Sequence, residues 1–226
     1  MRKLARTLGT LMIVAGLGTL AWAFAVWRWE DPFTSAYTAY EQRGLSSGLD
    51  KRFASYKPPE QHTSLGPAAL AAEARRYRQE SRTGGGIGRI EVPRLGLKMV
   101  LVWGTDHETL KRGPGLDPRT FFPGQSRLVY IAGHRTTYAA PFSKIDSLRR
   151  GDVIRVEMPY GTFRYTVTGN RIVAANDLSV LKSKQYEQIA LQACHPRFFA
   201  SQRWITYGRL TKVDPPSGDS SSAARD

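Results

Sequence analysis

The chain has 226 residues, of which 41% are hydrophobic, so it can bury the core of one ordinary domain. Its single cysteine, Cys194, excludes any disulfide bond within the chain. The formal net charge of +14 would favour nucleic acid as a partner in a cytosolic protein. Outside a membrane, such a charge favours anionic lipids or cell-wall polymers, or is simply a solvated surface.

Residues 8–27 form an uncharged run that is long enough to cross a bilayer as a helix. Three basic residues precede the run and two acidic residues follow it: Arg2, Lys3, Arg6, Glu30 and Asp31. The positive-inside rule therefore predicts a cytoplasmic tail over residues 1–7 and an extracytoplasmic remainder. A cleavable signal peptide is the alternative, but its apolar core is about 7–15 residues long. We expect an uncleaved, single-pass signal anchor in the cell membrane.

Residues 28–85 are predicted to be an extracytoplasmic stalk with one short helix. The part from 31 to 67 is rich in Ser, Gly, Pro and charge and has no steady apolar period. Residues 67–80 begin with proline and continue with strong helix formers, which predicts the helix. At the other end of the chain, residues 214–226 are poor in apolar residues, so we expect a disordered tail.

Residues 86–213 carry short β-like segments separated by turn signals. The segments are 88–92, 97–103, 127–133, 152–158, 162–169, 188–194 and 203–210. Several alternate apolar and polar residues, and "PYG" at 159–161 predicts a hairpin connection. The pattern favours a mainly β domain, an antiparallel barrel or sandwich, with short helices over 106–113 and within 140–152.

Cys194 lies at the end of an apolar strand, directly before "HPRFF", where the proline cannot continue the ladder. A lone cysteine is most often a small buried hydrophobe. A strand end that opens into a loop, however, holds a side chain rigidly and leaves it accessible. Because a thiol is mostly protonated at neutral pH, a nucleophilic cysteine needs a histidine or another cation nearby.

Four histidines are available to Cys194. His134 ends a β-run at a strand-to-loop junction similar to that of the cysteine, which makes it a candidate acid. His62 lies in the predicted stalk and His107 at the start of a predicted helix, where a surface role is expected. His195 follows the cysteine directly, and neighbouring side chains of a strand point to opposite faces.

Acyl transfer also requires a group that stabilises the oxyanion, and a guanidinium can do this. Arg197 lies in the loop after Cys194, and Arg203 begins the next strand. If the two strands pair antiparallel, Arg203 lies near the cysteine. We prefer Arg203, because regular elements hold catalytic geometry better than loops.

Together these segments resemble the sortases, a family of cysteine transpeptidases. The resemblance rests on "GRIEVPRLGL", "GPGLDPRTFFPGQ", "VYIAGHRTTYAAPF", a strand that ends in cysteine and an arginine at the start of the following strand. It runs from about Gly86 to Lys212, and "AGHRTTYAAPF" and "CHPRFFASQR" are most similar to actinobacterial class E sortases. The resemblance implies a closed antiparallel β-barrel with Cys194 as nucleophile, His134 as general acid/base and Arg203 as substrate-positioning and oxyanion-stabilising group.

The resemblance also implies the partners. Sortases cleave an L-P-x-T-G signal between Thr and Gly through a thioacyl enzyme, and class E members are associated with L-A-x-T-G. We therefore expect sorting-signal-bearing secreted proteins as substrates, a peptidoglycan precursor as amine acceptor, no nucleic acid and no cofactor. One departure is Ala193, where sortases usually have the threonine that helps shape the substrate groove. This departure leaves the signal preference open.

Three alternatives remain beside the cell-wall anchoring enzyme. A pilin-polymerising sortase uses the same chemistry, but no lid segment stands out in this sequence. An L,D-transpeptidase would have a Ser and a Gly before the cysteine, and "LQACHPR" has neither. A non-catalytic anchored barrel would bind cell-wall polymer through its basic face.

Overall fold

A computed structural model describes residues 2–28, 32–57 and 66–216. His62 and residues 217–226 of the predicted tail lie outside this range. The first helix, α1 (Arg2–Arg28), is continuous, and its stretch Arg2–Phe24 is long and apolar enough to cross a membrane. This stretch overlaps the membrane span that the sequence predicts over residues 8–27.

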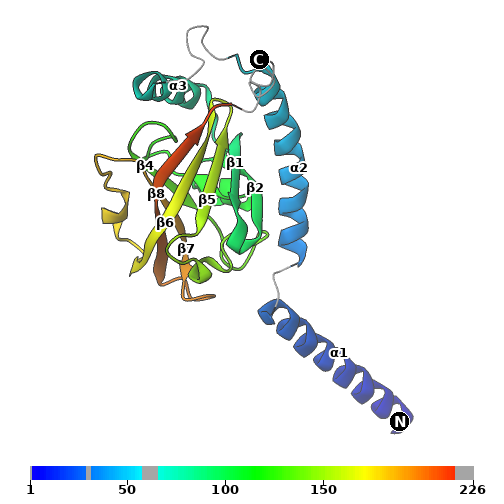
Figure 1. Cartoon of the computed structure of the whole chain (residues 1–226). Coiled ribbons are helices and arrows are strands. Elements are labelled where there is room, and N and C mark those ends of the chain that lie inside the picture. Colours follow the sequence, from blue (N-terminus) through cyan, green and yellow to red (C-terminus); the bar gives the residue numbers. More distant parts are fainter. Residues whose placement is uncertain (1, 29–31, 58–65, 217–226) are drawn as a thin grey trace.

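The domain that follows is a closed, eight-stranded barrel with the order β1-β2-β3-β4-β7-β8-β6-β5 (Figure 1). The mainly β fold and the closed barrel are therefore confirmed. The strands are β1 (Gly86–Val92), β2 (Leu97–Trp103), β3 (Gly115–Leu116), β4 (Leu128–Ala132), β5 (Val153–Met158), β6 (Gly161–Ala174), β7 (Gln188–His195) and β8 (Gln202–Asp214).

The barrel is mixed rather than wholly antiparallel, because β2 pairs with β3 and β4 pairs with β7 in parallel. Strands β4 and β7 are distant in the chain, and the whole β5–β6 hairpin lies between them. A parallel pair needs such a long connection, whereas a tight turn makes an antiparallel pair. The apolar pattern of a single strand does not encode which neighbour it will have, so the sequence missed this pairing.

Alternating side chains of β4 and β7 divide between two apolar clusters. Val129, Ile131, Ile189, Leu191 and Ala193 belong to the barrel core. The residues that alternate with them, Leu128, Tyr130 and Ala190, belong to a second cluster on the opposite face of the sheet, together with Ile205 of β8. Cys194 follows the buried Ala193, so the period of two directs the thiol away from the core.

Two of the predicted helices have the expected bounds. α3 (Pro67–Glu80) has proline in its first turn, and its Tyr77 hydroxyl donates to the Ile87 carbonyl at 3.0 Å. α4 (His107–Arg112) is capped by Asp106. The segment 140–152 forms only a 3₁₀ turn, η2 (Ile145–Ser147). Two further 3₁₀ turns, η1 (Pro93–Leu95) and η3 (Leu178–Leu181), were not predicted.

The largest departure is α2 (Pro32–Ser55), which occupies most of the stretch 31–67 of the predicted stalk and runs along the barrel beside β1 and β2 (Figure 1). Its inward face repeats every three or four residues: Thr38, Gln42, Leu45, Leu49 and Phe53. Two of these five side chains are polar, so the face is not visible as an apolar period. The Gln42 amide instead binds β2, donating to the Val100 carbonyl at 3.1 Å and accepting from the Val100 N–H at 2.7 Å.

Candidate active site

Cys194 and Arg203 are register partners in the antiparallel ladder between β7 and β8. Directly opposite residues place their side chains side by side on one face of a sheet. The thiol is partly exposed, as a nucleophile must be. One nitrogen of the Arg203 guanidinium, Nη1, donates to the carbonyls of Ala200 at 2.7 Å and Gln202 at 2.9 Å. These bonds hold the guanidinium against the loop between β7 and β8.

His134 follows the end of β4, at the same end of the barrel as Cys194. In the parallel pair of β4 and β7, Ala132 is opposite Gln192, and the Gly133 N–H donates to the Gln192 carbonyl at 3.0 Å. His134 and Cys194 each lie two residues beyond that pair. Gly133 is required here, because a Cβ at this position would lie 2.7 Å from the ring of Phe142.

The imidazole of His134 is half-buried between a loop and α4. Its ring centroid lies 5.0 Å from that of Tyr138 and 6.5 Å from that of His107. Burial lowers the pKa of His134, and its electrostatic interactions with His107 and Lys111 lower it further. Among the described residues, its buried Nε2 has no hydrogen-bond partner. A neutral imidazole with an unpartnered nitrogen can exchange a proton with a bound substrate.

The loop after His134 is held in an unusual backbone conformation. Tyr138, Ala139 and Ala140 have φ angles of +54°, +58° and +35°, which lie in or near the left-handed region that L-residues rarely adopt. The loop is tied down from α2, because the Tyr138 N–H donates to the Thr34 hydroxyl at 2.9 Å. The helix that replaces the predicted stalk therefore reaches the candidate site.

Arg135 connects the loop to the backbone of the cysteine. Its side chain is only 3% exposed, and its Nη1 donates to the Cys194 carbonyl at 3.2 Å and lies 2.9 Å from Nδ1 of His195. Nη2 pairs with the Asp146 carboxylate at 2.8 Å. Because a guanidinium can only donate, Nδ1 of His195 is the acceptor of this bond, and the ring proton of His195 is on Nε2. The residue thus fixes both the end of β7 and the η2 turn.

The other candidates from the sequence lie apart from the thiol. The ring of His195 packs on Trp204 at 5.6 Å and is bound by Arg135, so it does not share the face of Cys194. Arg197 is exposed on the β7–β8 loop. His107 is also exposed, but it faces the ring of His134, a proximity that the sequence did not predict.

Ala193 does not face the candidate site. Its side chain is fully buried in the barrel core, on the face of β7 opposite to the thiol. Alternation along the strand turns residue 193 inward, so its side chain belongs to the core beneath the candidate site. An effect of alanine at this position would act through the packing beneath Cys194.

Sequence reasoning did not identify Arg135, Tyr138 or Lys111 as parts of the site. The only available signal was that Arg135 and Tyr138 follow His134 in "GHRTTYAAPF". Lys111 comes from α4, and nothing in its local sequence links it to β4. Within the ranges that the structure describes, no group of three His, Cys, Asp or Glu side chains is placed to hold a metal ion.

A closed barrel with a thiol, an imidazole and a guanidinium at one sheet edge has the groups that acyl transfer through cysteine requires. The family model for the sortase domain matches residues 90–211, which is more than half of the chain. The chain belongs to the sortase family, whose members are cysteine transpeptidases.

Relatives come from more than one branch of this family. Sortase D of Bacillus subtilis is 27% identical over 164 residues, which cover 71% of this chain and 80% of that protein. A Clostridium perfringens sortase D5 transpeptidase shares the fold with a TM-score of 0.63 at 22% identity, over 76% of this chain and 99% of that one. Sortase E of Streptomyces avermitilis has a TM-score of 0.54 at 28% identity, over 59% and 93%. Class E sortases are thus among its structural neighbours.

Proposed function

We propose that this protein is a membrane-anchored sortase that cleaves an L-A-x-T-G or L-P-x-T-G sorting signal between Thr and Gly. It transfers the secreted protein that bears the signal to an amine of a peptidoglycan precursor. The observation that supports this most strongly is the register pair of Cys194 and Arg203, with His134 at the same sheet edge.

In this mechanism Sγ of Cys194 attacks the threonine carbonyl carbon, and its proton passes to His134. The oxyanion that forms lies beside the Arg203 guanidinium, whose Nε and Nη2 donors are not used by the Ala200 and Gln202 carbonyls. His134 then gives its proton to the glycine nitrogen as the C–N bond breaks, which leaves a thioester. The acceptor amine attacks the thioester and loses a proton to His134, which returns this proton to Sγ of Cys194 as the C–S bond breaks.

The environment of His134 sets the protonation state in which this cycle begins. Since the pKa of His134 is lowered by burial and by its interactions with His107 and Lys111, the neutral imidazole dominates at neutral pH. The thiolate–imidazolium pair is then a minor species, and we expect modest turnover. Acidification charges the imidazole, so activity falls on the acid side as His134 is kept from accepting the thiol proton.

The finer assignments rest on separate observations. Class E specificity is supported by the "AGHRTTYAAPF" and "CHPRFFASQR" segments and by the Streptomyces neighbour. A cytoplasmic N-terminus is supported by Arg2, Lys3 and Arg6 before the apolar helix. The catalytic domain would then lie outside the cell, where sorting-signal proteins and cell-wall precursors are found.

The test uses the full chain in nanodiscs with L-A-x-T-G and L-P-x-T-G peptides and a soluble amine acceptor. Mass spectrometry should find cleavage after Thr and an acyl adduct on Cys194, and Cys194→Ala should abolish both. Arg203→Ala should lose most of the activity, whereas the matched loop variant Arg197→Ala should keep it. If the folded chain cuts neither peptide and small thiol reagents do not modify Cys194, the chain is the non-catalytic barrel instead.

A further inference from the structure

Exposed aromatic side chains gather at one end of the molecule. Outside α1, the described residues include six exposed aromatic side chains, and five of them lie in two segments. These five are Phe33, Tyr37 and Tyr40 in the first turns of α2, and Phe198 and Phe199 in the loop between β7 and β8. Phe198 is 56% exposed and Phe199 is 80% exposed. Adjacent exposed phenylalanines mark an interaction surface rather than an ordinary loop.

The same end of the barrel is tied to the point where the chain leaves α1. Helix α1 ends at Arg28, and Thr34 of α2 accepts the N–H of Tyr138 at 2.9 Å. Six residues span at most about 20 Å, so the loop that carries Tyr138 lies within that reach of the end of α1. The Tyr138 ring is 5.0 Å from that of His134. A bilayer that holds α1 therefore lies close to the candidate site.

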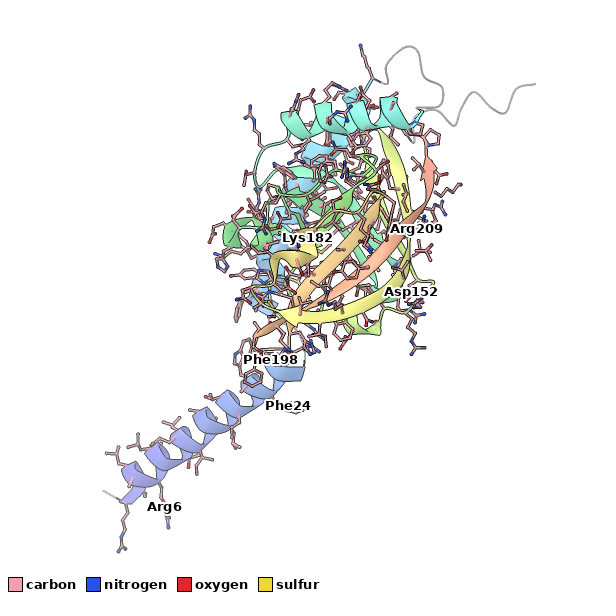
Figure 2. The ribbon with its side chains drawn as sticks, turned by 90° about the vertical axis from the view of Figure 1, so that its left-hand side faces the viewer. Arg6, Phe24, Asp152, Lys182, Phe198 and Arg209 are labelled. Carbon is pink, nitrogen blue, oxygen red and sulfur yellow. The ribbon has the colours of Figure 1, made fainter. Side chains whose placement is uncertain are left out.

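The β7–β8 loop faces the same direction. Figure 2 shows Phe198 at the end of the barrel from which α1 leaves, and in Figure 1 the connection after β7 lies at that end too. The loop is short and anchored, because Arg203 donates to the Ala200 carbonyl. The residue before the pair, Arg197, is exposed, as is Lys144 near the η2 turn. Aromatic rings flanked by basic side chains suit the surface of an anionic bilayer.

We propose that residues 196–201 dock on the outer surface of the bilayer that α1 crosses, with Phe198 and Phe199 at the boundary between headgroups and acyl chains. This proposal rests on the proposed membrane anchor. Docking turns the edge that carries Cys194 toward the membrane surface, where an acceptor held in the bilayer would be presented. The strand bearing the nucleophile ends one residue before the docked loop, so the two positions are rigidly linked.

The test measures the depth of the loop in the full chain. In the cysteine-free background Cys194→Ala, Ser201→Cys carries a nitroxide label beside the intact phenylalanine pair. The chain is placed in nanodiscs of phosphatidylcholine and phosphatidylglycerol, and relaxation by oxygen is compared with relaxation by a water-soluble nickel chelate. The matched control is Gln79→Cys in the same background, an exposed site on α3 at the far end of the barrel.

Docking predicts an oxygen-to-nickel accessibility ratio several-fold higher at residue 201 than at residue 79. Adding Phe198→Ser and Phe199→Ser should bring the ratio at residue 201 down to that of the control. If the ratio is equal at both sites in a chain that co-elutes with nanodiscs, docking is refuted and the anchor stands. If serine at both positions leaves the ratio high, the phenylalanines are not the docking groups. A chain that does not enter nanodiscs refutes the anchor and the docking together.

Discussion

Arg135 is expected to position the nucleophile, and replacing it by methionine tests this. Arg135→Met keeps the length of the side chain but removes its bonds to the Cys194 carbonyl and to His195. Hydrogen bonds from charged groups contribute about 1.5–3 kcal/mol each, while the pair with the half-exposed Asp146 contributes about 0–1 kcal/mol. Part of this loss is offset, because the variant no longer buries a guanidinium whose Nε has no hydrogen-bond partner in the described part of the chain. We therefore expect a net loss of about 2–4 kcal/mol of unfolding free energy.

The effect on activity should exceed what this loss of stability explains. A misplacement of the reacting atoms by about 1 Å can cost about 100-fold in rate, so the rate of acyl-enzyme formation should fall by about 10–100-fold at a temperature where the variant is folded. The KM for the peptide should change little, because the Arg135 side chain is buried and is therefore not available to contact a bound peptide. Arg135→Lys, which can still donate to one of the two acceptors, should recover part of the rate.

Single-turnover mass spectrometry measures the rate, and chemical denaturation measures the stability. Asp146→Asn is the matched control, because it removes the carboxylate charge and leaves the two bonds to β7 in place. It should cost less than about 1 kcal/mol and keep the wild-type rate. A folded Arg135→Met variant with the wild-type rate would refute the reasoning and leave Arg135 with a role in stability only.

Three further predictions concern other parts of the domain. Lys111→Met removes a cation that lowers the pKa of His134, so that pKa should rise toward its ordinary value in an NMR titration; an unchanged or lower pKa contradicts the assigned cause. Burial raises the pKa of Glu187, so the stability that this carboxyl contributes is present at acidic pH and is lost as the pH rises through the raised pKa. The difference in Tm between wild type and Glu187→Gln should therefore shrink with rising pH. A difference that grows with pH would show that the pKa of Glu187 is lowered by folding instead. A chain without α2 exposes Val100 and Val102 and should lose about 3–6 kcal/mol of unfolding free energy, whereas a chain that starts at Pro32 should keep the stability of the whole domain.

The strands that the sequence predicted best are short apolar segments in which most residues are buried. Residues 97–103 were predicted as a strand and form β2 with the same bounds, and 188–194 differs from β7 by one residue. The relation between Cys194 and Arg203 could also be anticipated, because a short loop between two strands fixes an antiparallel register. Both inferences depend on residues that are near each other in the chain.

The features that the sequence did not predict depend on residues that are far apart. The inward face of α2 contains Thr38 and Gln42, whose partners include the Lys111 and Arg112 carbonyls of α4, about seventy residues later in the chain. Arg135 also looks like a surface residue, although its guanidinium is buried against β7, which begins more than fifty residues later. Polar groups of this kind are buried only because specific partners satisfy them, and local patterns do not contain the partners.

The helix that replaces the stalk also influences the chemistry of the site. The pKa of His134 is lowered because its ring is buried and lies near His107 and Lys111 of α4. Helix α2 holds two neighbours of His134, Tyr138 and Lys111, in place. Thr34 accepts the Tyr138 N–H, and Thr38 donates to the Lys111 carbonyl at 2.7 Å. Loss of these two bonds would hydrate the imidazole and raise its pKa. Helix α2, which follows the long apolar helix α1, is therefore part of what keeps the proposed acid/base neutral.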